Sequence, residues 1–490
     1  MKGPAPDLRV GLTFDDVLLV PRFSNLKSRR DADTRTLFSR RIPLEVPVVS
    51  ANMDTVTESS MAIALARLGG IGVIHRFLTV DEQVAEVLKV KRSEGVVIED
   101  PITMGPDGTV REAWEIIRER SIGGIVVVDH HRRVLGILTR RDITLEEDTG
   151  KKVKEVMTPR RNLITARKGV TPDEARKILH ENRIEKLPLV DKNGALAGLI
   201  TSKDIMKRKQ FPSATKDSKG RLRVAAAVGV KGDHMLRAQK LLEAGADALV
   251  VDIAHGHSSY SVDTVKEIKR ELGDVEVVAG NVATSKGASD LVKAGADAVK
   301  VGVGSGSICV TRVVTGSGVP QLTAILDSAA GAAGTGVPII GDGGIRNPGD
   351  VTKALAAGAS SVMIGSLFAG TEESPGPTVL REGVRYKLTR GMASLAATVD
   401  RRVRESRTNG RDDELIEEVI EESVPEGVEG LIPYKGRVED VVKQLVGGLR
   451  SGMSYSGAHT LVELRKNGEF MKITSAGHKE SLPHDIQRVI

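Results

Sequence analysis

The chain has 490 residues, of which 40% are hydrophobic and 28% charged, a balance typical of globular proteins with a large core. Its length predicts two or three domains, and its composition excludes a disordered or fibrous protein. The net charge is only +6 and aromatic residues make up 2% of the chain, so we expect neither a nucleic-acid partner nor a surface that stacks bases.

The N-terminal segment, the apolar runs and the cysteine content indicate the cellular compartment of the protein. The N-terminal segment has no apolar stretch of the kind found in signal peptides, and no apolar run reaches the ~18 residues that a membrane-spanning helix needs. The single cysteine, Cys309, excludes an intrachain disulfide and fits a reducing compartment. We therefore expect a soluble, cytoplasmic protein with no membrane association.

The first part of the chain begins a parallel β–α pattern. Short Val- and Ile-rich runs at 47–54 and 70–76 flank a helical stretch. Such runs, alternating with helices, are typical of parallel strands that are buried on both faces. We assign residues 1–95 to the first part of a larger domain.

An internal repeat occupies the next segment. Residues 110–143 align with residues 172–205 at a constant offset of 62, without a gap. Each copy predicts an amphipathic helix, an apolar strand, a turn, a second strand and the start of a helix. Residues 96–211 are therefore expected to form a separate, duplicated domain.

The β–α pattern resumes after this insert. Six further apolar runs occur, at 224–230, 248–256, 276–282, 298–306, 338–344 and 361–368. Eight strands predict an α/β fold in which a closed (β/α)8 TIM barrel, completed by residues 212–490, carries the inserted domain. The competing fold, a doubly wound open sheet, normally has a glycine-rich fingerprint in its first βα turn, and this sequence has none there.

The loop after the sixth strand holds the only cysteine. Residues 302–312 contain three glycines, Cys309 and Arg312. A lone cysteine is more often a small buried hydrophobic residue. Backbone amides and a guanidinium in the same loop favour the thiolate, however, so we predict that Cys309 is a nucleophile.

The loops after the seventh and eighth strands suggest an anion site. Gly343-Gly344 and Gly365-Ser366 allow backbone N–H groups to approach a phosphate, and Asp342 is suited to accept ribose hydroxyl protons. The same glycines are compatible with simple tight turns. A phosphorylated ligand is the favoured interpretation, and Asp252, at the end of the fourth strand, is a further candidate for a polar ligand contact.

Several stretches together resemble a known family over nearly the whole chain. They include LTFDDVLLVP at 12–21, SANMDTVTE at 50–58, GNVAT at 280–284, DGGIR at 342–346 and AGHKES at 476–481. They are similar to the IMP dehydrogenase / GMP reductase family. The insert resembles that family's pair of cystathionine β-synthase-type (CBS) repeats, which in relatives bind adenine or guanine nucleotides.

The resemblance implies an NAD-dependent oxidation of IMP to XMP, in guanine nucleotide biosynthesis. Cys309 would add to C2 of IMP, hydride would leave to NAD, and water would hydrolyse the covalent thioimidate. Thr311, Glu426 and the flap residue Arg401 would assist the activation of water.

The resemblance also implies three sets of binding residues. The IMP set is Ser307, Asp342, Gly343, Gly344, Gly365, Ser366, Arg390, Gly391 and Met392. The NAD set is Asp252, Gly302, Val303 and Gly304. A potassium ion would be held by Gly304, Gly306 and Cys309, together with Glu480 and Ser481 of a neighbouring subunit. We expect a homotetramer, with an octamer formed through the CBS pair as the alternative.

The sequence departs from the family in the flap, at about 389–430. The family's Tyr-Arg-Gly-Met-Gly segment reads TRGMA at 389–393, and Arg401 is followed by a second arginine where the family has tyrosine. These departures leave open a GMP reductase, which deaminates GMP to IMP with NADPH. They also leave open a non-catalytic nucleotide sensor, although the intact cysteine loop argues against it.

The two repeats share a Thr-x-x-Asp motif with two interpretations. Thr139 and Asp142 in the first copy match Thr201 and Asp204 in the second. These pairs are suited to hold a ribose and phosphate, but the same spacing is typical of a helix-capping box. The sequence does not decide between the two.

Overall fold

A computed structural model describes the chain except for residues 1–7, 95–96, 121, 145, 407–423 and 484–490 and the side chains of 207–209 and 401–406. The chain divides into two compact units. The barrel unit comprises the chain up to Lys91, Ser213–Asp217 and Leu222 onward, and the repeat unit comprises Arg92–Pro212 and Ser218–Arg221. Among the described residues, no helix is both long and apolar enough to span a membrane.

Eight parallel strands form a closed barrel, as the sequence predicts. Their order is β13-β14-β15-β16-β17-β18-β4-β5, and pairing of β5 with β13 completes the ring. Nearly every strand residue is buried, because the strands pack against side chains both inside and outside the ring. The strands are β4 (Val48–Ser50), β5 (Ile71–Ile74), β13 (Ala225–Val228), β14 (Ala248–Asp252), β15 (Val277–Val282), β16 (Ala298–Val301), β17 (Ile339–Asp342) and β18 (Ser361–Ile364).

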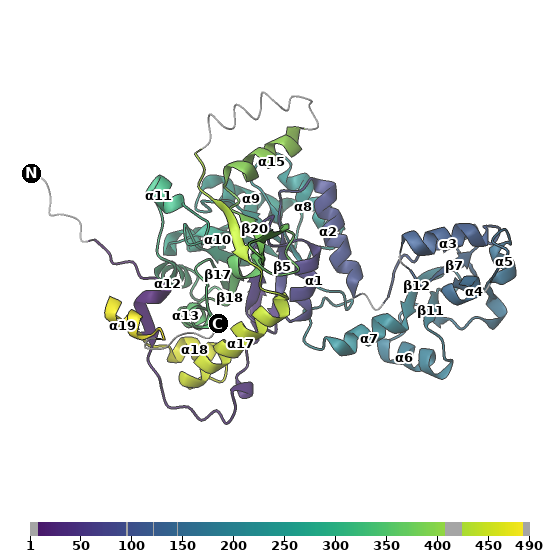
Figure 1. Cartoon of the computed structure of the whole chain (residues 1–490), viewed down its shortest axis with the longest axis horizontal. Helices are drawn as coiled ribbons and strands as arrows, with labels where there is room; N and C mark the ends of the chain where they lie inside the picture. The colour runs from purple at the N-terminus through teal and green to yellow at the C-terminus, as the bar shows by residue number, and fades with distance from the viewer. Residues whose placement is uncertain (1–7, 95–96, 121, 145, 407–423, 484–490) are drawn as a thin grey trace, which may run out of the picture. The chain divides into compact units, whose positions relative to one another are not determined.

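Helices surround this ring (Figure 1). Several of them end at a glycine with positive φ, such as Gly245, Gly295 and Gly358, which terminates the helix and turns the chain into the next strand. The helices are α1 (Ser59–Arg67), α2 (Val80–Ser93), α8 (His234–Glu243), α9 (Ser259–Glu271), α10 (Ser285–Ala294), α11 (Thr311–Thr315), α12 (Gln321–Gly331), α13 (Pro348–Ala356), α14 (Ser366–Ala369) and α17 (Val438–Tyr455).

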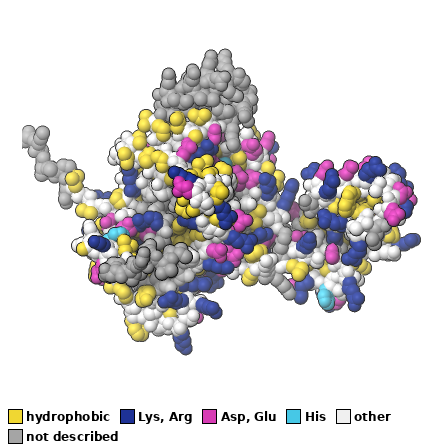
Figure 2. All heavy atoms as spheres, in the orientation of Figure 1, with side chains coloured by type: hydrophobic (Ala, Val, Ile, Leu, Met, Phe, Trp, Pro, Cys, Tyr) yellow, Lys and Arg dark blue, Asp and Glu magenta, His cyan; other side chains and the backbone are white. Residues whose placement is uncertain are grey.

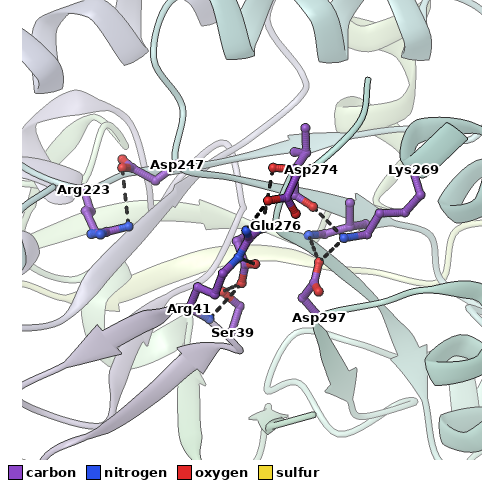
Figure 3. Close-up of polar contacts among 10 residues, drawn as sticks. Ser39, Arg41, Arg223, Asp247, Lys269, Asp274, Glu276 and Asp297 are labelled. Carbon is purple, nitrogen blue, oxygen red and sulfur yellow. Dashed lines mark hydrogen bonds and ion pairs between the residues drawn. The ribbon is translucent and has the colours of Figure 1, made fainter. Parts of the chain in front are cut away.

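A hairpin closes the N-terminal end of the barrel. Strands β2 (Thr36–Ser39) and β3 (Ile42–Leu44) place Phe38 and Ile42 among the residues that fill the barrel interior. Figure 3 shows the polar contacts at this end, where Glu276, just before β15, accepts hydrogen bonds from Ser39 at 2.5 Å and from Nε of Arg41 at 2.6 Å. A ligand therefore has to enter from the C-terminal ends of the strands.

The remaining elements of the barrel unit include the flap. Strand β1 (Val17–Leu19) pairs with β22 (Phe470–Lys472). Strands β19 (Thr378–Arg381), β20 (Val384–Arg390) and β21 (Glu429–Pro433) form a separate antiparallel sheet, and α15 (Leu395–Ser406) follows β20. The other elements are η1 (Phe14–Asp16), η2 (Arg29–Asp31), α18 (Leu461–Asn467) and α19 (Ser475–Glu480).

The repeat unit contains the internal duplication. Helix α3 (Val110–Glu119), strands β7 (Gly124–Val128) and β8 (Val134–Thr139), and helix α4 (Arg140–Thr144) form the first copy. They recur as α6 (Pro172–Glu181), β11 (Lys186–Val190), β12 (Leu196–Thr201) and α7 (Ser202–Gln210). The unit also contains β6 (Thr103–Met104), α5 (Val153–Val156), β9 (Thr158–Pro159), η3 (Arg160–Asn162) and β10 (Ala166–Arg167). Val126 and Val134 from the first copy pack with Val190 and Leu199 from the second, so the two copies share a core.

On the face shown in Figure 2, basic and acidic side chains are mixed on both units. This agrees with the small net charge of the chain.

Candidate active site

A cavity of about 260 Å³ lies at the C-terminal ends of the barrel strands. Its walls come from the loops after β4, β16, β17 and β18 and from strands β20 and β21. Six of the predicted IMP ligands line this one cavity: Ser307, Asp342, Gly343, Gly344, Gly365 and Ser366. Met53, Ile308 and Thr389 complete part of its wall.

The backbone conformation requires glycine at two positions in the cavity wall. Gly343 and Gly344 have φ values of +97° and +81°, in the left-handed region that favours glycine. A Cβ at Gly343 would also lie 2.4 Å from Oγ of Ser305. The loop therefore presents bare backbone beside the cavity, which suits an anionic ligand.

The cysteine loop leads into the short helix α11. Sγ of Cys309 and Oγ1 of Thr311 lie 3.1 Å apart, within hydrogen-bond distance, and Cys309 is partly exposed. Arg312 donates hydrogen bonds to the carbonyls of Val303 (3.2 Å) and Val319 (2.5 Å), so its guanidinium holds the shape of the loop. Gly304 has a φ of +73° and lies against the Arg312 side chain.

The segment that carries Glu426 is hydrogen-bonded to the cysteine loop. The amide of Val310 donates to the carbonyl of Glu426 at 2.8 Å, and the amide of Val428 donates to the carbonyl of Ile308 at 3.0 Å. Cys309 and Gly427 thus face one another as an antiparallel bridge. The predicted catalytic residues Cys309, Thr311 and Glu426 are therefore brought together.

The same segment also contacts the turn that contains Gly391 and Met392. The amide of Gly391 donates to the carbonyl of Val428 and the amide of Glu426 to the carbonyl of Ala393, each at 3.0 Å. Residues 426–428 therefore lie between the cysteine loop and this turn. These two predicted IMP ligands are thereby placed next to the segment that carries Glu426.

Arg390, a predicted IMP ligand, is paired with two carboxylates. Its Nε lies 2.7 Å from Asp54, in the loop after β4, and its NH1 lies 2.7 Å from Asp400, in α15. Burial by itself lowers the pKa of Arg390, but these hydrogen bonds outweigh it and raise the pKa. The guanidinium therefore joins the start of the flap to the barrel. Arg401 follows Asp400 in α15, and its side chain lies outside the described residues.

Asp252, a predicted NAD ligand, ends β14 and contacts a lysine that the sequence analysis did not select. Nζ of Lys300, in β16, lies 3.0 Å from Oδ1 of Asp252 and 2.9 Å from Oδ2 of Asp342. Burial opposes ionisation of Asp252, but Lys300 and Arg76 hold its pKa below the usual value. The sequence signal was a lysine inside the otherwise apolar strand AVKV.

The predicted potassium ligands form two separate groups. Gly304, Gly306 and Cys309 lie on one loop, which is tightened by a 3.2 Å hydrogen bond from the Cys309 amide to the Gly306 carbonyl. Glu480 and Ser481 lie at the end of α19, which packs against η1, and Figure 1 shows α19 and α11 at different places on the barrel unit. One chain therefore does not bring the two groups together. Within the described part of the chain, no three His, Cys, Asp or Glu side chains gather as a metal site.

In the repeat unit, the threonine and aspartate of each shared motif bind one another. Oγ1 of Thr139 donates to Asp142 at 2.7 Å, and Oγ1 of Thr201 donates to Asp204 at 2.5 Å. Both pairs lie at the start of a helix, which is the arrangement expected for capping. Nucleotide binding at these pairs stays a prediction.

Comparison with known proteins identifies the family. Residues 11–484 match the model of the IMP dehydrogenase / GMP reductase domain. The chain belongs to the IMP dehydrogenase / GMP reductase family. Among its relatives in this family, the inosine-5′-monophosphate dehydrogenase of Nitrosopumilus maritimus is 55% identical, over 98% of this chain and 99% of the relative. The enzyme of the same name from Aquifex aeolicus is 54% identical, over 98% and 96%.

A solved structure from the same family supports the fold. It is a cysteine-to-alanine variant of GMP reductase from Trypanosoma brucei, in complex with guanosine 5′-monophosphate. It is 44% identical to this chain, with a TM-score of 0.91, and the match covers 98% of this chain and 99% of that one. Both branches of the family are thus represented among the similar proteins.

Proposed function

We propose that this chain catalyses the NAD-dependent oxidation of IMP to XMP, a step in guanine nucleotide biosynthesis. The relatives named inosine-5′-monophosphate dehydrogenase are 54–55% identical to it over nearly their whole length, against 44% for the GMP reductase structure. One observation carries the proposal. The cysteine loop, with Cys309 and Thr311, is hydrogen-bonded to the segment that carries Glu426, and this loop borders a cavity whose wall contains several glycines.

IMP occupies the cavity in this proposal. The loops containing Ser307, Gly343-Gly344 and Gly365-Ser366 supply backbone and hydroxyl donors for the phosphate, and Asp342 accepts the ribose hydroxyl protons. Gly391 and Met392 lie in the turn that residues 426–428 join to the cysteine loop, and in this proposal they complete the site for the base. Asp252 ends β14, and Gly302, Val303 and Gly304 follow β16 at the same end of the barrel. In this proposal these four residues form the NAD site.

The cysteine makes loss of hydride possible. Hydride leaves C2 of a purine readily only after a nucleophile has made that carbon tetrahedral, so the Cys309 thiolate first forms a C–S bond to C2. Hydride then passes from C2 to NAD, and a thioimidate remains on the cysteine. Water adds to the same carbon, the C–S bond breaks, and XMP leaves while the thiol is restored. Thr311 and Glu426 orient this water and take its proton, together with Arg401 from the flap.

The carbonyls of the cysteine loop would hold potassium in this proposal. A loop tightened on itself, with Gly304, Gly306 and Cys309 close in sequence, presents the type of ligand that replaces the hydration shell of this ion. Because α19 packs against η1 of the same chain, Glu480 and Ser481 would reach this loop from a neighbouring subunit of the proposed homotetramer. Bound potassium would hold the loop that carries the nucleophile.

One assay separates this function from that of a GMP reductase. The purified chain is incubated with IMP and NAD, and in parallel with GMP and NADPH, while absorbance of the reduced nicotinamide is followed. The proposal expects NADH to accumulate in the first mixture and NADPH to persist in the second. Consumption of NADPH with GMP and inactivity toward IMP would establish the reductase, the alternative that the unusual flap sequence leaves open.

The repeat unit would serve as a CBS pair that binds adenine or guanine nucleotides. A regulatory role is supported by the compactness of this unit, which has its own hydrophobic core. Deletion of residues 96–211 is expected to preserve basal turnover and to abolish any response to ATP or GTP, as well as any octamer seen by light scattering. An unchanged nucleotide response in the deleted chain would contradict this assignment.

A further inference from the structure

Lys300 lies at the centre of a polar cluster that joins four consecutive barrel strands. We infer that Lys300 is a positioning residue, which holds Asp252 and Asp342 in fixed relation and so couples the NAD site to the IMP site. The inference rests on the proposed function, which assigns these two aspartates to the two substrates.

All three N–H groups of the Lys300 ammonium have a hydrogen-bond acceptor within the protein. Its side chain is 3% exposed, and its ammonium group contacts Asp252 at 3.0 Å, Asp342 at 2.9 Å and Oδ1 of Asn281. An ammonium group has three N–H donors, and here each one meets an acceptor. Lys300 therefore has no donor left for a substrate, so its effect on the reaction passes through the residues it holds.

The cluster also fixes the direction of the Asp342 carboxylate. Oδ2 receives hydrogen bonds from Lys300 at 2.9 Å and from Nδ2 of Asn281 at 2.9 Å. No described residue donates to its other oxygen, Oδ1, and Asp342 lines the cavity. Two donors on one oxygen set the plane of the group, which leaves the second oxygen for a ribose hydroxyl.

The charge of the lysine is needed as well as its hydrogen bonds. Burial by itself lowers the pKa of Lys300, but Asp252 and Asp342 together outweigh it and raise the pKa, so the group stays protonated. Without the cation, the carboxylates of Asp252 and Asp342 would lose the positive charge that both of them contact. Nearby like charges disfavour each other's ionised form, so we expect one carboxylate to take up a proton or to turn away.

A second lysine in the same unit offers a matched control. Lys91 is also 3% exposed, and it lies 2.9 Å from Asp217 and 2.8 Å from Asp247. Asp247 immediately precedes β14, at the N-terminal end of the barrel and away from the cavity. Lys91→Met therefore removes the same type of buried ion pair without touching either substrate site.

The experiment compares Lys300→Met with Lys91→Met in the full chain. Thermal melting confirms folding, steady-state kinetics give KM for IMP and for NAD, and calorimetry gives the affinity for IMP alone. We expect Lys300→Met to raise both KM values and to weaken IMP binding by about tenfold or more, which corresponds to the loss of one charge-assisted hydrogen bond. Lys91→Met should lower the melting temperature while both KM values stay within about twofold of the parent.

Parent-like KM values in folded Lys300→Met would overturn the inference, and so would equal shifts in the two methionine variants. If Lys300→Met does not fold, Lys300→Arg decides, because it keeps the charge but a planar guanidinium cannot reach the same three acceptors. That variant should show a smaller rise in both KM values, and parent-like values would refute the coupling. If the parent reduces GMP instead of oxidising IMP, the proposed function fails, and the same variants measured with GMP and NADPH still test Lys300.

Discussion

Replacing Gly427 with alanine should separate the two halves of the reaction. A Cβ at this position would lie 3.0 Å from the amide nitrogen of Ser394, 3.2 Å from Cα of Gly391 and 3.3 Å from the carbonyl carbon of Ala393. All three are backbone atoms, which cannot rotate away as a side chain can. The segment has to move by several tenths of an ångström, and overpacking of this kind costs about 1–3 kcal/mol.

This displacement acts on Glu426, the neighbour of Gly427 in the chain. The backbone of Glu426 is hydrogen-bonded to Val310 on one side and to Ala393 on the other, so a shift of residues 426–428 moves it relative to Cys309. A misplacement of about 1 Å can reduce a rate by about 100-fold, so we expect a shift of several tenths of an ångström to reduce it by about 10- to 100-fold. In the proposed mechanism, attack by Cys309 does not use Glu426, so hydride transfer should be affected less than hydrolysis.

Rapid mixing of Gly427→Ala with IMP and NAD, followed by absorbance, measures both steps. We expect a burst of about one NADH per active site followed by a steady rate about 10- to 100-fold below the parent. Gly447→Ala in α17 is the control, because a Cβ there meets no atom within 4 Å. The reasoning is refuted if the two variants have the same steady rate, or if Gly427→Ala loses its burst to the same extent as its steady rate.

Three further substitutions test other parts of the molecule. Cys309→Ala should abolish turnover and leave IMP binding measurable by calorimetry, and residual turnover would argue against a covalent intermediate. Arg401→Ala should keep the NADH burst while steady turnover falls by about 100-fold, as expected on removal of a catalytic base; an unchanged rate would exclude this role. Glu276→Gln should lower the melting temperature at neutral pH. Burial opposes ionisation of Glu276, but hydrogen bonds from Ser39 and Arg41 hold its pKa below the usual value, so the stabilisation is present above about pH 4.3 and is lost as the pH falls through the folded-state pKa. The difference between Glu276→Gln and the parent should therefore shrink in acid, and an equal difference at both pH values would contradict this origin.

The barrel strands could be predicted from the sequence because parallel strands buried on both faces leave an unmistakable apolar run. The ends of the strands could not be predicted, because the loops that follow them contain valine and glycine as the strands do. The run predicted at 298–306 corresponds to β16, which ends at Val301, and the rest is the cysteine loop. The repeat was visible because its two copies keep one offset, and the structure reproduces that offset in their helices and strands.

The partners of the charged residues could not be predicted from the sequence. The family resemblance placed Arg390 with the IMP ligands, but its carboxylate partners are Asp54, which is distant in sequence, and Asp400. Lys300 was missed because a lysine in an apolar strand has no visible partner until the register of β14, β16 and β17 is known. The sequence shows which residues belong to the same loop, but only the strand order and register of the closed barrel show which loops lie side by side.

The way in which the ring closes dictates an order for folding during synthesis. Strands β4 and β5 pair with each other, but each also pairs with a strand that is synthesised much later. Val48 in β4 pairs with Val362, and Val73 in β5 pairs with Ala225. The repeat unit, whose contacts are local, is synthesised in between and can fold first. Until β18 leaves the ribosome, β4 presents an unpaired apolar edge, and such edges are prone to aggregate. We therefore expect completion of the barrel to be the stage of folding at which this chain is most exposed to aggregation.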